Sequence, residues 1–252
     1  MKIIAVYSSK GGVGKTAAAV NLSYSAAQCG HRVLLCDLDA QGAASFYFRV
    51  RPDKDFTGKK FMKGGLGKFI RASDYNNLDL LPAHFSFRNL DLALAKLEDK
   101  KRRGALRKLF STLADEYDVL IMDCPPNMTL LSENIILAAD SVVTPVIPTT
   151  LSLLALQQLL KLFKKVGAGE QRINAFFSMV EQRKIMHRDV IAKYHSHPIF
   201  RSAQIPYLAE IEKMGINRQP VGAVSHLSTA AKHYNSLWLE IWNRSNDRSK
   251  DI

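Results

Sequence analysis

Short apolar runs alternate with helix-like stretches along most of this chain. The runs have the length of buried strands and fall at residues 3–7, 33–36, 78–81, 119–122, 141–147 and 173–179. Helix-like segments lie between most of them, at residues 17–29, 91–97, 105–116, 130–138 and 153–166. Strands that alternate with helices form parallel βαβ units. The pattern therefore predicts an α/β fold of three layers (αβα), in which a mostly parallel twisted sheet carries helices on both faces.

We expect one domain over residues 1–252, because neither an internal repeat nor a clear linker divides the chain. Two further helices are predicted at residues 190–194 and 227–242, followed by a polar tail at 244–252. The least regular part is residues 49–68, which holds seven basic and two acidic residues. We interpret it as a basic loop or mobile insertion, either a solvated surface or a contact with DNA or protein.

Composition narrows the class of protein. The formal net charge of +12 and the sequence pI near 9.6 favour a polyanionic partner, either nucleic acid or an acidic membrane. No apolar run approaches the roughly 20 residues that cross a bilayer, and the N-terminus lacks a secretory signal. We therefore expect a cytoplasmic protein. The three cysteines form no C-x-x-C pair, and their odd number argues against a disulfide framework.

A glycine-rich loop follows the first predicted strand. Residues 8–16 read Ser-Ser-Lys-Gly-Gly-Val-Gly-Lys-Thr, and an alanine-rich helix follows directly. Backbone N–H groups in such a loop and the helix N-terminus together form a cradle for phosphates. In this pattern Lys15 reaches the β- and γ-phosphates, and the Thr16 hydroxyl ligates Mg²⁺. Ser9 stands where the usual motif has its first glycine, and Lys10 adds a second lysine.

Carboxylates follow two of the other predicted strands. Asp37 and Asp39 come directly after the second strand and share one face of an extended segment. Asp123 ends the strand at residues 119–122. Ligand sites of parallel α/β sheets lie at the carboxyl ends of the strands. We therefore expect these carboxylates beside the phosphate loop.

These three segments resemble the nucleotide boxes of the ParA/MinD family of P-loop ATPases. The stretch Lys10-Gly-Gly-Val-Gly-Lys15-Thr16 resembles the family's deviant Walker A box. The stretch after residue 36 resembles the D-x-D-P-Q-G motif, with Ala40 in place of the proline, and Asp123-Cys-Pro-Pro resembles the Walker B box and its switch segment. The likeness spans roughly residues 1–242, and it is loose outside these boxes.

The resemblance implies a role for each residue. ATP and Mg²⁺ are the expected cofactors. Lys10 would reach the nucleotide of a partner subunit in an ATP-bound homodimer, and Asp39 would orient or activate the attacking water. The Mg²⁺ site would consist of Thr16, Asp37 and Asp123. The nucleotide would contact Lys10, Gly11, Gly12, Val13, Gly14, Lys15, Thr16 and Ala17. Ala17 lacks the hydroxyl that many relatives place on the α-phosphate, so we expect somewhat weaker affinity.

Adenine contacts are predicted at Met179 and Pro206, where the family chain passes the base. A core position for Met179 remains an alternative.

The leading functional hypothesis is a ParA-like ATPase that positions a plasmid, a chromosome region or other cargo. The ATP-bound dimer would bind DNA without sequence preference, and slow hydrolysis, stimulated by a small ParB-like or cargo adaptor, would release it. The protein would then associate with the nucleoid. Basic candidates for DNA contact lie toward the C-terminus, and each alone could be an ordinary solvated charge: Lys213, Arg218, Lys232, Arg244 and Arg248.

Two other classes stay open. A MinD-like membrane switch is suggested by the apolar stripe of Leu237, Trp238, Ile241 and Trp242. That stripe could equally pack the last helix onto the core, and the tail is too polar for a good anchor, so we expect no membrane binding. A metabolic P-loop ligase is the third class. The chain has no length for a glutaminase domain, and such an enzyme gives no reason for Lys10.

Overall fold

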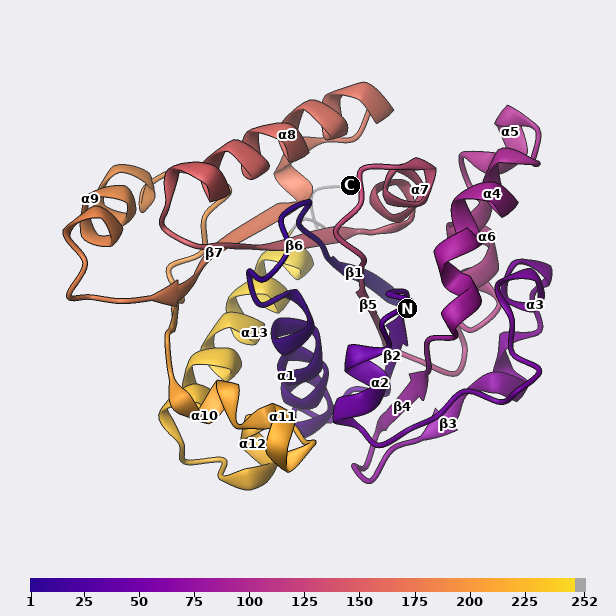
Figure 1. Cartoon of the computed structure of the whole chain (residues 1–252), viewed down its shortest axis with the longest axis horizontal. Helices are drawn as coiled ribbons and strands as arrows, with labels where there is room; N and C mark the ends of the chain where they lie inside the picture. Colours follow the sequence, from indigo (N-terminus) through magenta and orange to yellow (C-terminus); the bar gives the residue numbers. More distant parts are fainter. Residues whose placement is uncertain (248–252) are drawn as a thin grey trace.

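The computed structural model describes the backbone of residues 1–247 and the side chains of residues 1–244. Eight strands form one sheet in the order β3-β4-β2-β5-β1-β6-β7-β8 (Figure 1). All neighbouring strands are parallel except β3 and β4. The strands are β1 (Lys2–Val6), β2 (Val33–Asp37), β3 (Arg71–Ala72), β4 (Leu78–Leu81), β5 (Val119–Asp123), β6 (Ser141–Val146), β7 (Ile173–Val180) and β8 (Ile205–Pro206).

Helices cover both faces of this sheet, which confirms the predicted three-layer α/β fold (Figure 1). Alternate residues of β1 point to opposite sides: Ile4 and Val6 enter one core cluster, whereas Ile3 and Ala5 enter the other. The cluster of Ile4 is closed by helices α1 (Lys15–Gln28), α2 (Ala43–Tyr47), α11 (Met214–Asn217), α12 (Val221–Val224) and α13 (Thr229–Asp247), with α10 (Ala209–Glu212) beside it.

The cluster of Ile3 is closed by six other helices. These are α3 (Gly58–Lys63), α4 (Leu90–Ala95), α6 (Ala105–Ser111), α7 (Leu130–Ala138), α8 (Thr150–Val166) and α9 (Ile185–Tyr194). The short α5 (Asp99–Arg102) buries none of its residues. The described residues also form three 3₁₀ turns: η1 (Leu66–Phe69), η2 (Phe85–Asn89) and η3 (Glu170–Arg172).

Only the first part of residues 49–68 forms the loop that the sequence suggests, since residues 49–57 contain neither helix nor strand. After it, helix α3 and turn η1 fold around a cluster of phenylalanine rings, in which Phe56 and Phe69 stack at 4.4 Å between centroids. Phe61 packs against the same group and against Phe110 of α6. The sequence pattern does not predict this helix and turn, because the apolar residues are separated by charged ones and recur at neither a helical nor a strand period.

Three helix ends lie five residues from their predicted positions. Helix α9 begins at Ile185, whereas the pattern placed its start at residue 190. Helix α6 ends at Ser111, whereas the pattern extended it to residue 116; the next residues form turns, with Tyr117 N–H donating to the Leu113 carbonyl. Helix α13 continues to Asp247, so the expected tail begins inside a helix. Residues 248–252, and with them Arg248, lie outside the described residues. Strands β3 and β8 have two residues each, too few for a readable pattern.

Candidate nucleotide-binding site

The glycine-rich loop connects β1 to α1 in a conformation that its glycines allow. Gly12 and Gly14 have φ angles of 70° and 90°, a region that residues with a Cβ rarely adopt. A Cβ on Gly14 would also approach Ser178 Oγ to 3.2 Å. No side chain caps the first turn of α1, and that turn holds no acidic residue. The loop and helix N-terminus therefore fit an anionic group such as phosphate.

The two lysines of this loop diverge. Lys15 is buried, and its Nζ donates to the carbonyl of Lys10 at 3.2 Å. Burial lowers the pKa of Lys15, while the nearby Asp123 carboxylate opposes that shift. Lys10 turns the other way, and its Nζ donates to Ser152 Oγ at 3.0 Å in the first turn of α8. The Lys15 amine therefore lies inside the loop of its own chain, whereas the Lys10 amine lies at the outer edge of the loop, beside α8.

Asp37 and Asp123 lie opposite each other at the ends of β2 and β5. Asp37 accepts hydrogen bonds from the Ser45 N–H at 2.8 Å and from the Ser45 hydroxyl at 2.7 Å. Neither carboxylate oxygen of Asp123 has a hydrogen-bond partner among the described residues. Burial raises the pKa of both carboxyls, and repulsion by Asp37 adds to the shift of Asp123. A cation beside this pair would offset a buried negative charge.

These residues fit a magnesium site. The Thr16 hydroxyl lies close enough to lower the pKa of Asp123, and the Asp123 oxygens need a partner. Within residues 1–244, no three acidic, histidine or cysteine side chains converge as a metal cage. Mg²⁺ usually keeps several waters and takes few protein ligands beside nucleotide phosphate. Thr16, Asp37 and Asp123 would hold it in this way.

Asp39 lies at the half-buried rim of the site. Its backbone N–H donates to Asp37 at 3.3 Å, and its own Oδ1 accepts from the Gln41 N–H at 3.0 Å. Gln41 is exposed, and Gly42 turns the chain with a φ of 67° into α2. The turn thus holds the Asp39 carboxylate at the opening, where a water molecule can reach it.

A cavity beside the phosphate loop contains both predicted adenine contacts. Met179 and Pro206 line it together with Gly14 and Ala17 of the loop and helix α1. Met179 has a φ of 54°, which is rare for a residue with a side chain and often marks a binding site. Ser178 and Tyr234, which the sequence did not indicate, belong to the same region. The structure therefore places Met179 at the cavity wall.

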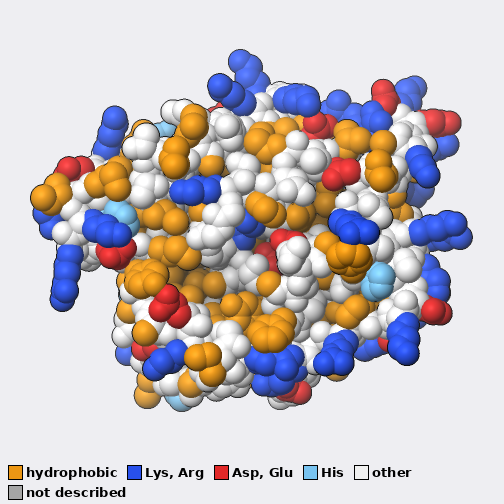
Figure 2. Space-filling model, in the orientation of Figure 1, with side chains coloured by type: hydrophobic (Ala, Val, Ile, Leu, Met, Phe, Trp, Pro, Cys, Tyr) orange, Lys and Arg blue, Asp and Glu red, His pale blue; other side chains and the backbone are white. Residues whose placement is uncertain are grey.

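The basic candidates do not form one cluster. Arg218 ends α11, Lys213 lies between α10 and α11, and Lys232 lies on the first turns of α13. Arg244 is far along α13 and donates to the Gln171 carbonyl. Figure 2 shows lysine and arginine side chains mainly around the margin of one face, with acidic atoms in a central hollow.

The apolar stripe of α13 belongs to the protein core. Leu237, Trp238 and Ile241 are at most 1% exposed and pack in the cluster that also holds α1. Trp242 stacks on Trp238 with 5.3 Å between centroids. Within the described chain, no helix offers an apolar stretch of the length that crossing a membrane requires. The stripe is thus unavailable as a membrane anchor in this conformation.

Replacement of Asp123 by asparagine is expected to raise the melting temperature of the ligand-free protein by about 2–6 °C at pH 7.5. The raised pKa values mean that the folded state binds more protons than the unfolded chain. Its free energy of unfolding therefore falls as pH rises above the ordinary carboxyl range. The gain from D123N should shrink as the pH falls. Calorimetry in EDTA measures this.

Asp118 provides the matched control, because its carboxyl pKa is shifted in the opposite direction from that of Asp123. The Arg32 guanidinium bonds Asp118 and lowers its pKa to about 2. The ion pair stabilises the folded state at pH values above the ordinary carboxyl pKa, and this stability is lost as the pH falls toward 2. Because the pair is exposed, D118N should leave the melting temperature at pH 7.5 unchanged or slightly lower. If D123N lowered the melting temperature as D118N does, Asp123 would not carry an uncompensated charge.

Comparison with known proteins shows what this chain is similar to in sequence. The family model described as an AAA domain matches residues 1–178. The chromosome-partitioning ATPase Soj of Treponema pallidum is 27% identical over 257 residues, which cover 98% of this chain and 99% of that protein.

Solved structures share the fold. A plasmid partition protein from Borrelia burgdorferi B31, bound to AMPPNP, superposes with a TM-score of 0.79 at 22% identity, covering 96% of this chain and 98% of the other. Cobyrinic acid a,c-diamide synthase from Mycobacterium smegmatis, with ADP and magnesium, gives the same TM-score at 24% identity and covers 96% and 95%. A partition protein and a metabolic enzyme thus have this architecture, so the fold alone does not choose between them.

Proposed function

This chain belongs to the ParA/MinD family of P-loop ATPases, and from that premise we propose that it is an ATP-dependent positioning switch. ATP binding pairs two copies, the pair binds DNA without sequence preference, and hydrolysis of ATP to ADP and phosphate separates the copies and releases the DNA. The cargo is a plasmid, a chromosome region or another cellular body.

The divergence of the two loop lysines supports this proposal most. Lys15 points back into the loop of its own chain, whereas the Lys10 amine lies on the first turn of α8 and makes one hydrogen bond with Ser152. If a second copy brought its nucleotide to this edge, the Lys10 amine could donate to a phosphate oxygen of that nucleotide in place of the Ser152 hydroxyl. Charge-assisted contacts to phosphate are stronger than neutral ones. Lys10 would thus favour pairing only when ATP is bound.

Residues of the phosphate loop and of the rim of the site would carry out hydrolysis. Lys15 and the loop N–H groups hold the β- and γ-phosphates, and Asp39 orients the attacking water through its carboxylate. Thr16, Asp37 and Asp123 would hold Mg²⁺, which would neutralise charge on the phosphate oxygens. Tyr7, whose hydroxyl donates to the Asn127 carbonyl at 2.8 Å, fastens the segment after Asp123. We expect slow turnover until an adaptor, such as a small ParB-like protein, stimulates it.

DNA binding is the part of the proposal that a simple experiment tests. The net charge of +12 is the supporting observation. Fluorescence anisotropy with a random-sequence duplex should show binding in ATP and little in ADP. Affinity should fall about tenfold or more between 50 and 200 mM salt if several phosphates are neutralised. Absence of ATP-dependent binding at low salt would remove DNA from the proposal.

The same preparation separates the alternatives. Because the apolar stripe of α13 is buried, we expect no co-sedimentation with anionic liposomes in ATP. Sedimentation that required ATP would favour a membrane switch instead. An adaptor that speeds phosphate release would support a partition role and, in cells, nucleoid association. An ATP-dependent ligation product would instead place the protein among the metabolic enzymes.

A further inference from the structure

The cavity beside the phosphate loop contains a charged side chain that the nucleotide site described above does not use. Of the described residues that line this cavity, only Glu212, the last residue of α10, is charged. The walls are mainly apolar and include Met179, Pro206, Leu208 and Ile211. In a binding site with apolar walls, the few polar groups decide which ligand fits and how it is oriented. Glu212 is therefore placed to distinguish one nucleobase from another.

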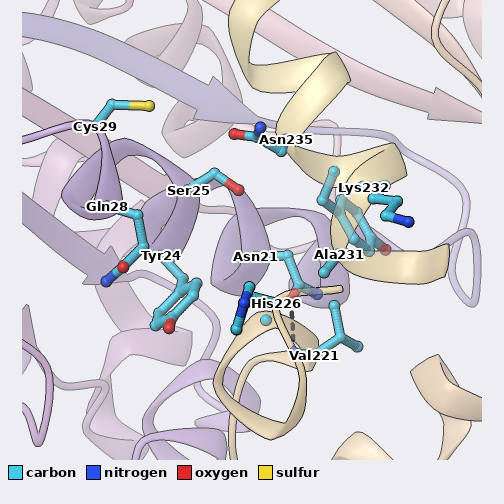
Figure 3. A pocket seen from close by; sticks show the side chains of 12 residues that line it. Asn21, Tyr24, Ser25, Gln28, Cys29, Val221, His226, Ala231, Lys232 and Asn235 are labelled. Carbon is cyan, nitrogen blue, oxygen red and sulfur yellow. Dashed lines mark hydrogen bonds between the residues drawn. The ribbon is translucent and has the colours of Figure 1, made fainter. Parts of the chain in front are cut away.

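A second hollow adjoins this cavity, because Tyr234 lines both. It is a groove of about 300 Å³ between α1, α12 and α13, and its lining includes Asn21, Tyr24 and His226 (Figure 3). None of the described residues that line the groove belongs to the phosphate loop, whereas the cavity of Glu212 includes Gly14 of that loop. A base whose phosphates lie in the loop therefore enters the cavity of Glu212 and not the groove.

Tyr207 holds the Glu212 carboxylate at the rim of the cavity. The Tyr207 hydroxyl donates to Glu212 Oε1, and the Tyr207 backbone N–H donates to the Val180 carbonyl at 3.0 Å, at the end of β7. The hydrogen bond to Glu212 raises the pKa of Tyr207, so the phenol keeps its proton and acts as the donor. Within the described part of the chain, no donor reaches the other carboxylate oxygen, Oε2. One acceptor of Glu212 is thus occupied and one is open.

The two purines present different edges to such a carboxylate. Guanine carries two adjacent donors, N1–H and the N2 amine, which match both oxygens of a free carboxylate. Adenine carries one donor, the N6 amine, beside the acceptor N1. A carboxylate with one open oxygen can satisfy the single amine of adenine, but it leaves one of the two guanine donors without a partner. An unpaired donor is costly where water is excluded.

We propose that Tyr207 and Glu212 select adenine over guanine: Glu212 Oε2 accepts from the N6 amine of the base, and the Tyr207 hydroxyl denies guanine the second oxygen. This rests on the ATP binding proposed above and adds two specificity-determining residues beside the expected base contacts Met179 and Pro206. Neither residue lies among the lysines and carboxylates that hold the phosphates and the cation, so the choice of base is separable from hydrolysis.

An ATP analogue without the amine tests the role of Glu212. Purine riboside triphosphate has hydrogen in place of the N6 amine. In calorimetry with Mg²⁺, the wild-type protein should bind ATP about tenfold more tightly than this analogue, because the analogue lacks the hydrogen bond to a charged acceptor. Glu212→Ala should bind ATP and the analogue equally. Asp189→Ala removes an exposed carboxylate of α9 outside the cavity and should keep the preference of the wild-type protein.

Equal melting temperatures of E212A and D189A show that both variants fold. A preference for ATP that E212A retained in full would overturn the role of Glu212. Equal binding of ATP and the analogue by the wild-type protein would overturn base selection by this pair, while the ATP site itself would stand. If the wild-type protein bound neither nucleotide, the proposed function would fail together with this inference.

Tyr207→Phe tests the second half of the proposal, because it removes only the hydroxyl and frees Oε1. Y207F should bind GTP about tenfold more tightly than the wild-type protein does, since guanine then meets a bidentate carboxylate. Its affinity for ATP should change by less than about twofold, because Oε2 is unaltered. The gain for GTP should vanish when Glu212→Ala is added to Y207F. A Y207F variant that binds GTP no better than the wild-type protein would overturn the role of Tyr207.

Discussion

Replacement of Lys15 by alanine is expected to weaken ATP binding by about 100-fold or more. The Lys15 amine is buried at the mouth of the loop and has one hydrogen-bond acceptor, the Lys10 carbonyl, to exchange for phosphate oxygens. A charge-assisted contact of about 3 kcal/mol corresponds to roughly that factor. Isothermal titration calorimetry with ATP and Mg²⁺ measures the loss directly.

Lys161→Ala is the control for this change. Lys161 is exposed on α8, so its removal costs the same formal charge and leaves the phosphate cradle intact. K161A should bind ATP as the wild-type protein does. Retained ATP affinity in K15A would show that phosphate binds elsewhere, and the site built on residues 8–16 would be wrong.

Replacement of Asp39 by alanine should slow hydrolysis by about 100-fold without loss of ATP binding. Asp39 stands at the opening, held by the Gln41 N–H, whereas the buried carboxylates are Asp37 and Asp123. Loss of a group that orients or activates water typically costs two to four orders of magnitude in rate. Phosphate release measures the rate, and light scattering should show that the ATP-bound pair persists longer.

Two further variants separate the effect of the Asp39 charge from the effects of side-chain shape and of general loss of a carboxylate. Asp39→Asn keeps the shape but removes the charge, so it should be nearly as slow as the alanine variant. Asp55→Ala removes an exposed carboxylate paired with Lys60 and should leave the rate unchanged. A D39A protein that stays monomeric in saturating ATP, or that hydrolyses at the wild-type rate, would show that Asp39 has another role.

Local sequence carried most of the information about the phosphate loop and the carboxylates. The loop is continuous from residue 8 to residue 16, and Asp37 and Asp123 each end an apolar strand, so parallel pairing brings them side by side. Sequence reasoning could not find Ser152 beside Lys10, because 142 positions separate them. Ser45 was missed for a related reason: its bonds to Asp37 depend on the turn at Gly42.

Longer-range packing explains the other differences. The phenylalanines of residues 49–68 become a core only when Phe87 and Phe110 join them. The apolar stripe of α13 fits a membrane-binding face and a packed face equally well in the sequence, and only the packing against α1 shows that it belongs to the core.

We propose that ATP pairs two copies through Lys10, and the molar mass in solution measures this pairing. Light scattering after gel filtration in AMPPNP and Mg²⁺ should give twice the 28.2 kDa chain mass for the wild-type protein and the single mass in ADP. Lys10→Ala should still bind the nucleotide, because Lys15 and the loop remain, but should elute at the single mass in both. Wild-type protein that stays monomeric in saturating AMPPNP, or a K10A variant that pairs as well as wild type, would show that Lys10 does not hold an ATP-bound pair together.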